Sequence, residues 1–177
     1  RRELGGTDNT KCASAMSKMA AVLKMQVKLD DAVKLLKKAA EIEKNELGAD
    51  SPTLALTLYH LGGVLEEQGR LVESLEQYRN AVLIAKQSLG TEHVDYARYQ
   101  VGTARVLQRM GKDDDALDVY TRALHIYQKW FGPSHCHTMT CRQRIIDLAG
   151  ASEYQAGTSP RAEALPAAAQ PSPSRAR

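Results

Sequence analysis

Apolar side chains recur along the middle of the chain at alternating intervals of four and three residues, the spacing of one face of an α-helix. Residues 71–85 form the clearest such run, and residues 54–65 form a second one before it. The polar turn Gln68-Gly69-Arg70 separates them, and glycine suits the end of a helix because it adopts left-handed backbone angles freely. Ser51-Pro52 is typical of a helix start. The pattern therefore predicts two helices joined by a tight turn.

This helix–turn–helix unit recurs every 42 residues. Leu47-Gly48, Leu89-Gly90 and Phe131-Gly132 are spaced by that interval, and residues 68–90 align with 110–132 without a gap. The aligned pairs are Gly69 with Gly111, Leu75 with Leu117, Tyr78 with Tyr120, Ala81 with Ala123, and Ile84 with Ile126. One period earlier stand Val33, Leu36, Ala39 and Ile42. A fixed period of this length indicates stacked structural repeats.

Small residues mark the places where helices must approach closely. Ala20, Gly62 and Ala104 each lie seven positions before the turn, and Ala39, Ala81 and Ala123 lie within the second helix of each unit. A large side chain there would hold the helices apart, at a typical cost of about 1–3 kcal/mol.

The register predicts an all-α solenoid with defined boundaries. We expect residues 1–9 to be the tail of a preceding repeat or a linker, followed by repeats over 10–48, 49–90 and 91–132. Residues 133–150 are expected to form a capping helix, half a repeat, that is apolar on one side only. Residues 151–177 are rich in Ala, Pro and Ser and lack periodicity, so we expect a disordered tail.

The segments "GRLVES", "YRNAVLIAKQSLGTEH" and "VYTRALHIYQKWFGPSH" resemble the tetratricopeptide repeat in its 42-residue, kinesin-light-chain-like form. The resemblance covers about residues 4 to 150. It implies a right-handed α-α superhelical solenoid of about three and a half repeats that serves as a protein–protein interaction scaffold. The paired asparagines of light-chain repeats are replaced here, for example by Tyr59-His60, and the preceding coiled coil is absent. We therefore expect a repeat of this type and not the motor subunit itself.

The resemblance also implies that the first helix of each repeat lines a concave groove. Its groove positions are occupied here by Lys24, Tyr59, Arg98, Val101, Arg105, Gln108 and Arg109, among others. The three arginines are spaced by seven and four, so they share one helical stripe, and guanidinium groups bind carboxylates through paired N–H donors. Our hypothesis is a protein or peptide partner with acidic residues, as in cargo adaptors; the alternative is a solvated face with charges placed for solubility.

Charge and composition limit the other classes of partner that we expect. A net charge of +3 gives no strong case for nucleic acid. No apolar run reaches the roughly 18 residues of a membrane span. Three cysteines without framework spacing favour a reducing compartment, so we expect a cytoplasmic protein. The chain begins at Arg1, which suggests a fragment or processed product.

The stretch "FGPSHCHTMTC", residues 131–141, raises the question of a metal site. His135 lies 42 residues after His93, so we interpret it as a turn residue, and we expect Ser134 to cap the next helix. His137 and Cys141 are four apart on that helix, but no fourth ligand or zinc spacing accompanies them. We predict no metal, no cofactor and, since no catalytic motif is present, no enzyme.

One alternative function stays open at this point. The chain could be a structural solenoid fragment of a larger cytoskeletal, flagellar or signalling assembly, or the sensor end of a larger nucleotide-switch protein. Exposed convex charges such as Lys34, Lys37 and Glu76 favour the groove over a buried assembly surface.

Overall fold

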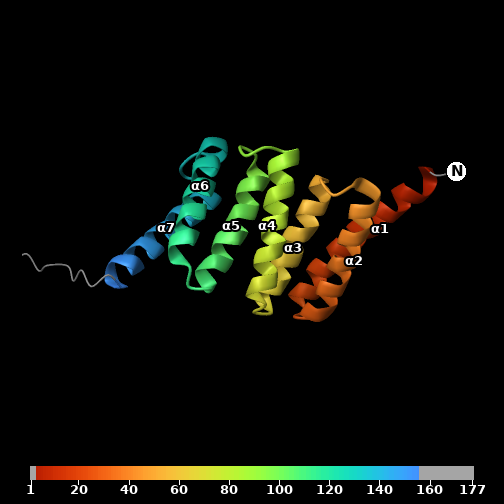
Figure 1. Cartoon of the computed structure of the whole chain (residues 1–177), viewed down its shortest axis with the longest axis horizontal. Helices are drawn as coiled ribbons and strands as arrows, with labels where there is room; N and C mark the ends of the chain where they lie inside the picture. The colour runs from red at the N-terminus through yellow and green to blue at the C-terminus, as the bar shows by residue number, and fades with distance from the viewer. Residues whose placement is uncertain (1–2, 156–177) are drawn as a thin grey trace, which may run out of the picture.

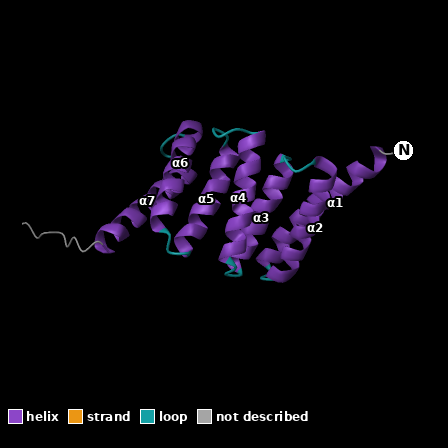
Figure 2. Ribbon diagram, viewed as in Figure 1, coloured by secondary structure: helices purple, strands orange, loops and turns teal. Residues whose placement is uncertain are grey.

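The structure, a computed structural model, describes residues 3–155, and every regular element in that range is a helix (Figures 1 and 2). In chain order these are α1 (Glu3–Met25), α2 (Leu29–Leu47), α3 (Pro52–Glu67), α4 (Leu71–Ser88), α5 (Val94–Arg109), α6 (Asp113–Phe131) and α7 (Cys136–Gln155). The predicted all-α fold is confirmed.

The helices form a row in which each one packs against the next along the chain. Figure 1 shows this order running from α1 at one end to α7 at the other. In addition, α1 contacts α3 and α3 contacts α5, whereas α2, α4 and α6 make no comparable approach to one another within residues 3–155. The row therefore closes more tightly on the side of the first helices of each pair, which makes that side the inner face of the solenoid.

The predicted apolar and small positions form the core. Ala39, Ala81 and Ala123 have no exposed surface, and neither have Tyr78 and Ala85. A buried tyrosine of this size contributes more apolar area than its aliphatic neighbours. The 42-residue period thus places one small residue at each closely packed point of the stack.

The tight turns within repeats share one hydrogen-bond pattern. At the end of α3, the amide of Arg70 donates to the Leu65 carbonyl and the amide of Gly69 donates to the Glu66 carbonyl, both at 3.0 Å. This is the Schellman motif, whose central residue needs a positive φ. Gly69 and Gly111 supply it, with φ of 77° and 73°.

The corresponding residue in the first repeat is Val27, with φ of 62°. It forms the same turn, since the amide of Lys28 donates to the Leu23 carbonyl at 2.9 Å. A β-branched residue is disfavoured in left-handed conformation. The first repeat therefore holds a strained residue where the other two hold glycine.

The starts and ends of the stack differ from the predicted boundaries. Residues 3–9, expected to be a tail or linker, form the start of α1, and α7 continues to Gln155 through the first five residues of the predicted tail. The remainder of that tail, residues 156–177, lies outside the described residues, as do residues 1 and 2. At α3 the predicted cap is confirmed, because Ser51 Oγ accepts a hydrogen bond from the Thr53 amide at 3.3 Å.

Within the described part of the chain, none of the helices combines the length and the apolar character needed to cross a bilayer.

Candidate functional site: the inner face of the repeats

A cavity of about 280 Å³ opens on the inner face between α1, α3 and α5. Three of the predicted groove residues, Lys24, Tyr59 and Arg105, line it together with His60 and Tyr78. We call it the central cavity. The register therefore brings together residues that are up to 81 positions apart in the sequence, because each stands on the first helix of a successive repeat.

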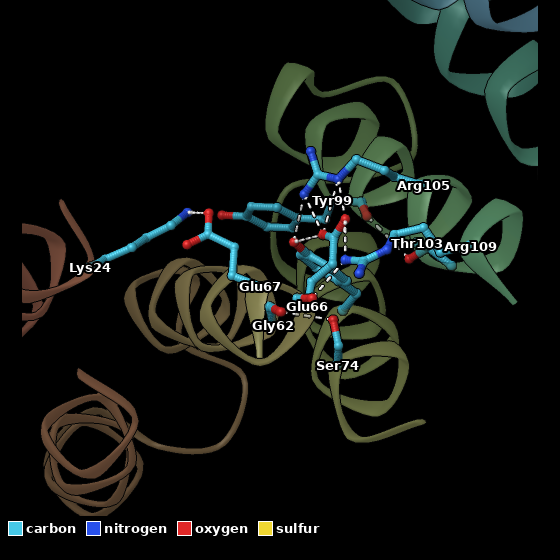
Figure 3. A network of polar contacts seen from close by, with 10 residues as sticks. Lys24, Gly62, Glu66, Glu67, Ser74, Tyr99, Thr103, Arg105 and Arg109 are labelled. Carbon is cyan, nitrogen blue, oxygen red and sulfur yellow. Dashed lines mark hydrogen bonds and ion pairs between the residues drawn. The ribbon is translucent and has the colours of Figure 1, made fainter. Parts of the chain in front are cut away.

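Glu66 at the end of α3 is the centre of a polar network beside this cavity (Figure 3). Its carboxylate accepts from Arg105 Nε at 2.7 Å and from Arg105 Nη2 at 2.6 Å. Arg109 Nη1 donates to the Glu66 backbone carbonyl at 2.6 Å. Two arginines from the third repeat thus bind one glutamate from the second, and they hold α5 against α3.

The hydroxyl of Tyr78 completes this network, which we call the Glu66 network. It donates to Glu66 Oε2 at 3.2 Å and accepts from Arg105 Nη2 at 2.9 Å. The Tyr78 ring fits between Gly62 and Gly102; a Cβ added at Gly102 would lie 2.6 Å from Tyr78 Cε1. Glycine is required there because the ring occupies the space of a side chain.

The pKa values in the Glu66 network keep its charges fixed. The hydrogen bonds that Arg105 donates to Glu66 raise the pKa of the Arg105 guanidinium above its usual range. Burial, more than any neighbouring charge, raises the pKa of the Tyr78 hydroxyl. Arg105 therefore stays charged and Tyr78 stays neutral at every physiological pH.

The predicted arginine stripe is only partly available for a ligand. Arg98 pairs with Asp95 at 3.1 Å, one turn earlier on α5. Lys24 pairs with Glu67 at 2.9 Å (Figure 3). Arg105 and Arg109 keep side-chain exposures of 41% and 45% despite their bonds to Glu66. Two guanidiniums against one carboxylate leave the Glu66 network with a net positive charge.

An aromatic cluster forms the apolar part of the inner face. The Tyr59 ring lies 5.1 Å from the Tyr99 ring and 5.6 Å from the Tyr78 ring, measured between centroids. Tyr59 itself is half-buried, and so are Val101 and Gln108 on α5. Aromatic pairs at such distances stabilise packing beyond their buried area. Tyr59 therefore places an apolar ring on the inner face beside Arg105.

Glu66 is one of the further groove positions that the resemblance implies, and its role as an acceptor was not predicted. The register contained a signal: Lys24, Glu66 and Gln108 are equivalent positions, as are Ala21, Gly63 and Arg105. Gly63 lies beside the end of the Tyr78 side chain: a Cβ added at Gly63 would lie 3.4 Å from the Tyr78 hydroxyl oxygen. Glu66 and Arg105 have opposite charges and stand at neighbouring groove positions of successive repeats, which could have indicated that they pair.

The histidine- and cysteine-rich stretch at the start of α7 has structural contacts. His135 Nδ1 accepts from the His137 amide at 3.3 Å, so His135 caps the helix, and the expected cap Ser134 does not take this position. His93 caps α5 in the same way, accepting from the Asp95 amide at 3.1 Å. His135 is the last residue before α7, and from there its ring reaches the first free amides of the helix. Ser134 lies one residue further from the helix.

The other residues of that stretch pack in the stack. The His137 ring stacks on the Tyr127 ring with centroids 5.5 Å apart, and Cys141 is 2% exposed. Burial raises the pKa of the Cys141 thiol to about 11, which disfavours the thiolate that a metal binds. Across the described residues, no three His, Cys, Asp or Glu side chains gather as a metal site would require.

These helix pairs define a repeat solenoid, and the comparison with known families gives its class. The tetratricopeptide repeat model matches residues 11–71 and 53–129. The chain belongs to the tetratricopeptide repeat family. Repeats of this family are non-catalytic scaffolds that generally mediate protein–protein interaction.

Solved structures share the fold. The nearly identical TPR-like repeats of a Podosopora anserina protein assigned as a kinesin light chain superpose with a TM-score of 0.67 at 19% identity, covering 81% of this chain and 68% of that one. BtubC (BKLC) from P. vanneervenii gives a TM-score of 0.55 at 16% identity, with 88% and 68% covered. The Sgt2 TPR domain from Aspergillus fumigatus gives 0.62 at 12% identity, with 89% and 90% covered. No curated protein matches the chain in sequence.

Proposed function

We propose that the chain is a peptide-binding module whose ligand lies along the inner face of α1, α3 and α5. The groove residues in this proposal are those predicted from the register: Lys24, Tyr59, Arg98, Val101, Arg105, Gln108 and Arg109. The central cavity supports it, because it offers a concave space of about 280 Å³ beside the half-buried Tyr59 ring. Concave sites with a few converging polar groups are where ligands bind most often.

We further propose that the ligand carries an acidic residue that binds at the Glu66 network. The observation that supports this most is the excess of cationic groups there. Glu66 is almost fully buried, whereas the side chains of Arg105 and Arg109 keep 41% and 45% of their surface exposed. Their remaining N–H groups can donate to an incoming carboxylate without breaking the bonds to Glu66.

The test uses an array of twelve-residue peptides in which one Asp or Glu is moved through an otherwise neutral sequence, with binding measured by fluorescence polarisation. Arg109→Gln should weaken the binding of acidic peptides by roughly tenfold or more, because a hydrogen bond to a charged group contributes about 1.5–3 kcal/mol. Arg109 is preferred over Arg105 because Arg105 donates to the Glu66 carboxylate, so that its loss would disturb the stack, whereas Arg109 donates to the Glu66 backbone carbonyl.

The matched control is Arg79→Gln, an exposed arginine on the outer helix α4. Unchanged melting temperatures must accompany both substitutions. Equal affinity of the parent chain and Arg109→Gln for acidic peptides would contradict the acidic preference. Absence of binding to every peptide of the array would contradict the peptide-binding function itself.

A further inference from the structure

A second cavity, of about 220 Å³, lies next to the central cavity between α1 and α3. Its lining includes Ser14, Ser17, Thr57 and, from the second helix of the repeat, Glu43. We call it the Glu43 cavity. The two cavities share Ser17, Ala21 and His60 in their walls, so they adjoin each other on the inner face.

Glu43 is unlike other acidic residues described on this face. Its side chain is 1% exposed, and its Oε2 atom is buried without a hydrogen-bond partner. By contrast, Glu66 is satisfied by two arginines and Glu67 by Lys24. A buried carboxylate oxygen without a partner costs free energy that a donor would recover.

Packing alone does not call for a carboxylate at this position. The equivalent residues of the next two repeats are Ala85 and Tyr127, which are 0% and 4% exposed. The stack therefore accommodates a small or an aromatic side chain where the first repeat has Glu43. The first repeat therefore buries a carboxylate that a hydrogen bond with Thr57 compensates only in part, and such groups concentrate at functional sites.

The remaining lining of the Glu43 cavity suits a cation. The hydroxyls of Ser14, Ser17 and Thr57 can each accept a hydrogen bond, and Ser17 Oγ lies 3.4 Å from Thr57 Oγ1. Lysine and arginine side chains carry several donors and no acceptor, so a carboxylate surrounded by hydroxyls can satisfy them. A volume of about 220 Å³ accommodates the end of one such side chain.

Two titratable residues in the wall of the Glu43 cavity, His60 and Lys18, affect whether a cation can bind there. Desolvation, followed by the positive charges of Lys24 and Arg98, lowers the pKa of His60, so the ring is neutral at physiological pH and does not repel a cation. Lys18 is exposed on α1 and lines the cavity as well. Its long stem allows the ammonium group to remain in water.

We infer that the Glu43 cavity receives a lysine or arginine side chain of the peptide that lies on the inner face. This inference rests on the proposed function and deepens it. Because the Glu43 cavity adjoins the central cavity, a bound peptide would place its cationic residue toward the first repeat and its acidic residue toward the Glu66 network. The two sites of opposite charge would then fix the direction in which the peptide binds.

The first experiment tests the cavity without a peptide. N-acetyl-arginine amide and N-acetyl-lysine amide are titrated separately into the full chain, and backbone amide shifts are followed by NMR. We expect saturable shifts at Ser14, Ser17 and Thr57 in the millimolar range. The neutral analogue N-acetyl-glutamine amide should give none, and Glu43→Gln should abolish the shifts. The matched control Glu41→Gln, an exposed glutamate two residues away on α2, should retain them.

Absence of shifts with both cations overturns the inference, and so do equal shifts in the parent chain and Glu43→Gln. Because Glu43→Gln removes a buried charge, we expect it to fold at least as well as the parent, so loss of binding could not be attributed to unfolding. Should a folding defect appear, Glu43→Asp with the same titration provides the second variant. It retains the charge and should keep part of the shift.

The second experiment uses peptides that carry one acidic and one basic residue at varied separation and in both orders. One order should bind more tightly, and Glu43→Gln should weaken that order by roughly ten- to a hundredfold while leaving purely acidic peptides unchanged. Equal binding of both orders overturns the inference. Cation shifts without any peptide binding would contradict the proposed function alone, whereas acidic peptide binding without cation shifts would contradict the inference alone.

Discussion

The junction between the second and third repeats and the junction between the first and second have the same backbone design but different interiors. Tyr78 fills the later junction, and Leu36 occupies the equivalent position in the earlier one. Arg105 and Glu66 cross the later junction, where the earlier one has Gly63 and Lys24. The later junction is therefore closed by a ring and an ion pair with a buried carboxylate, while the earlier one has only a smaller leucine and the exposed pair of Lys24 with Glu67 at these places.

The difference shows where stability and binding can each be located in a repeat array. In the closed junction the Glu66 carboxylate is satisfied internally, by Arg105 and the Tyr78 hydroxyl. The open junction contains Glu43, whose Oε2 atom has no hydrogen-bond partner, and both cavities of the inner face border it. The turn within the first repeat also holds the strained Val27. Groups that are costly in the free protein tend to mark places where a ligand would relieve them.

Gly102→Ala should have the largest effect, because it disrupts the closed junction. The added Cβ would lie 2.6 Å from the Tyr78 ring, which is fixed between two helices. We expect a loss of about 3 kcal/mol in the free energy of unfolding, the upper end of overpacking costs. Chemical denaturation measures it.

The control is Gly150→Ala in α7, where an added Cβ meets no atom within 4 Å. Alanine favours helix over glycine, so a gain of about 0.5–1 kcal/mol is expected there. Similar losses for both substitutions would mean that the Tyr78 ring is free to move and that the junction is not closed.

Glu66→Ala should cost about 2 kcal/mol, since it leaves the Arg105 guanidinium and the Tyr78 hydroxyl without their acceptor. The adjacent Glu67→Ala removes an exposed pair with Lys24 and should cost less than about 0.5 kcal/mol. Thermal denaturation of the two variants side by side measures the contrast. Equal melting temperatures would contradict a structural role of the Glu66 network.

Val27→Gly should stabilise the open junction by about 1 kcal/mol, because glycine relieves the left-handed strain that the β-branched residue bears. The same replacement at Val72, which is exposed on helix α4, should instead destabilise by about 0.5–1 kcal/mol. Equilibrium unfolding in urea distinguishes the signs. A loss at both positions would show that Val27 is not strained.

Glu43→Gln should have the smallest effect and should depend on pH. Burial raises the pKa of Glu43, an effect that a hydrogen bond with Thr57 offsets in part. The folded state thus binds the proton more tightly than the unfolded state, and stability falls as pH rises above the unfolded pKa of about 4.3. Glu43→Gln has no carboxylate at this position and does not lose stability in this way. Its free energy of unfolding at about pH 7 should therefore exceed that of the parent chain by a few tenths to about 1 kcal/mol.

Near pH 4 the two chains should unfold at nearly the same temperature, because Glu43 of the parent is then protonated. Lys18 and His60, the titratable groups that share the cavity, are present in both chains and cancel in the difference. A pH-independent difference between the chains would contradict the burial of a charged Glu43.

The sequence was sufficient for the helices and their order because the same apolar register appears in three successive units. Tyr78 and Tyr120 lie 42 residues apart, as do Ala81 and Ala123, and each is fully or almost fully buried. The start of α1 was not predictable from this register, since residues 3–9 contain two glycines and no apolar periodicity. The same holds for the last turn of α7, which follows Gly150.

The site was predictable only in part. The register identified Lys24, Tyr59 and Arg105 as neighbours on the inner face, and they line one cavity. It did not reveal that Glu66 binds Arg105, because that bond depends on how two helices are rotated across a junction. Alignment of Glu43 with Ala85 and Tyr127 could have indicated its burial, and alignment of Val27 with Gly69 its left-handed backbone.

Because each helix packs mainly against its immediate neighbours in the row, a pulling force along the molecule would separate one junction at a time. Pulling on the two ends would lengthen the chain in separate steps, each releasing one helix pair. The pair formed by α1 and α2 would detach first, since the exposed pair of Lys24 with Glu67 ties α1 to α3 less tightly than the buried Glu66 carboxylate ties α5 to α3. The surface that we propose for peptide capture would then come apart at low force, while the rest of the stack remained folded.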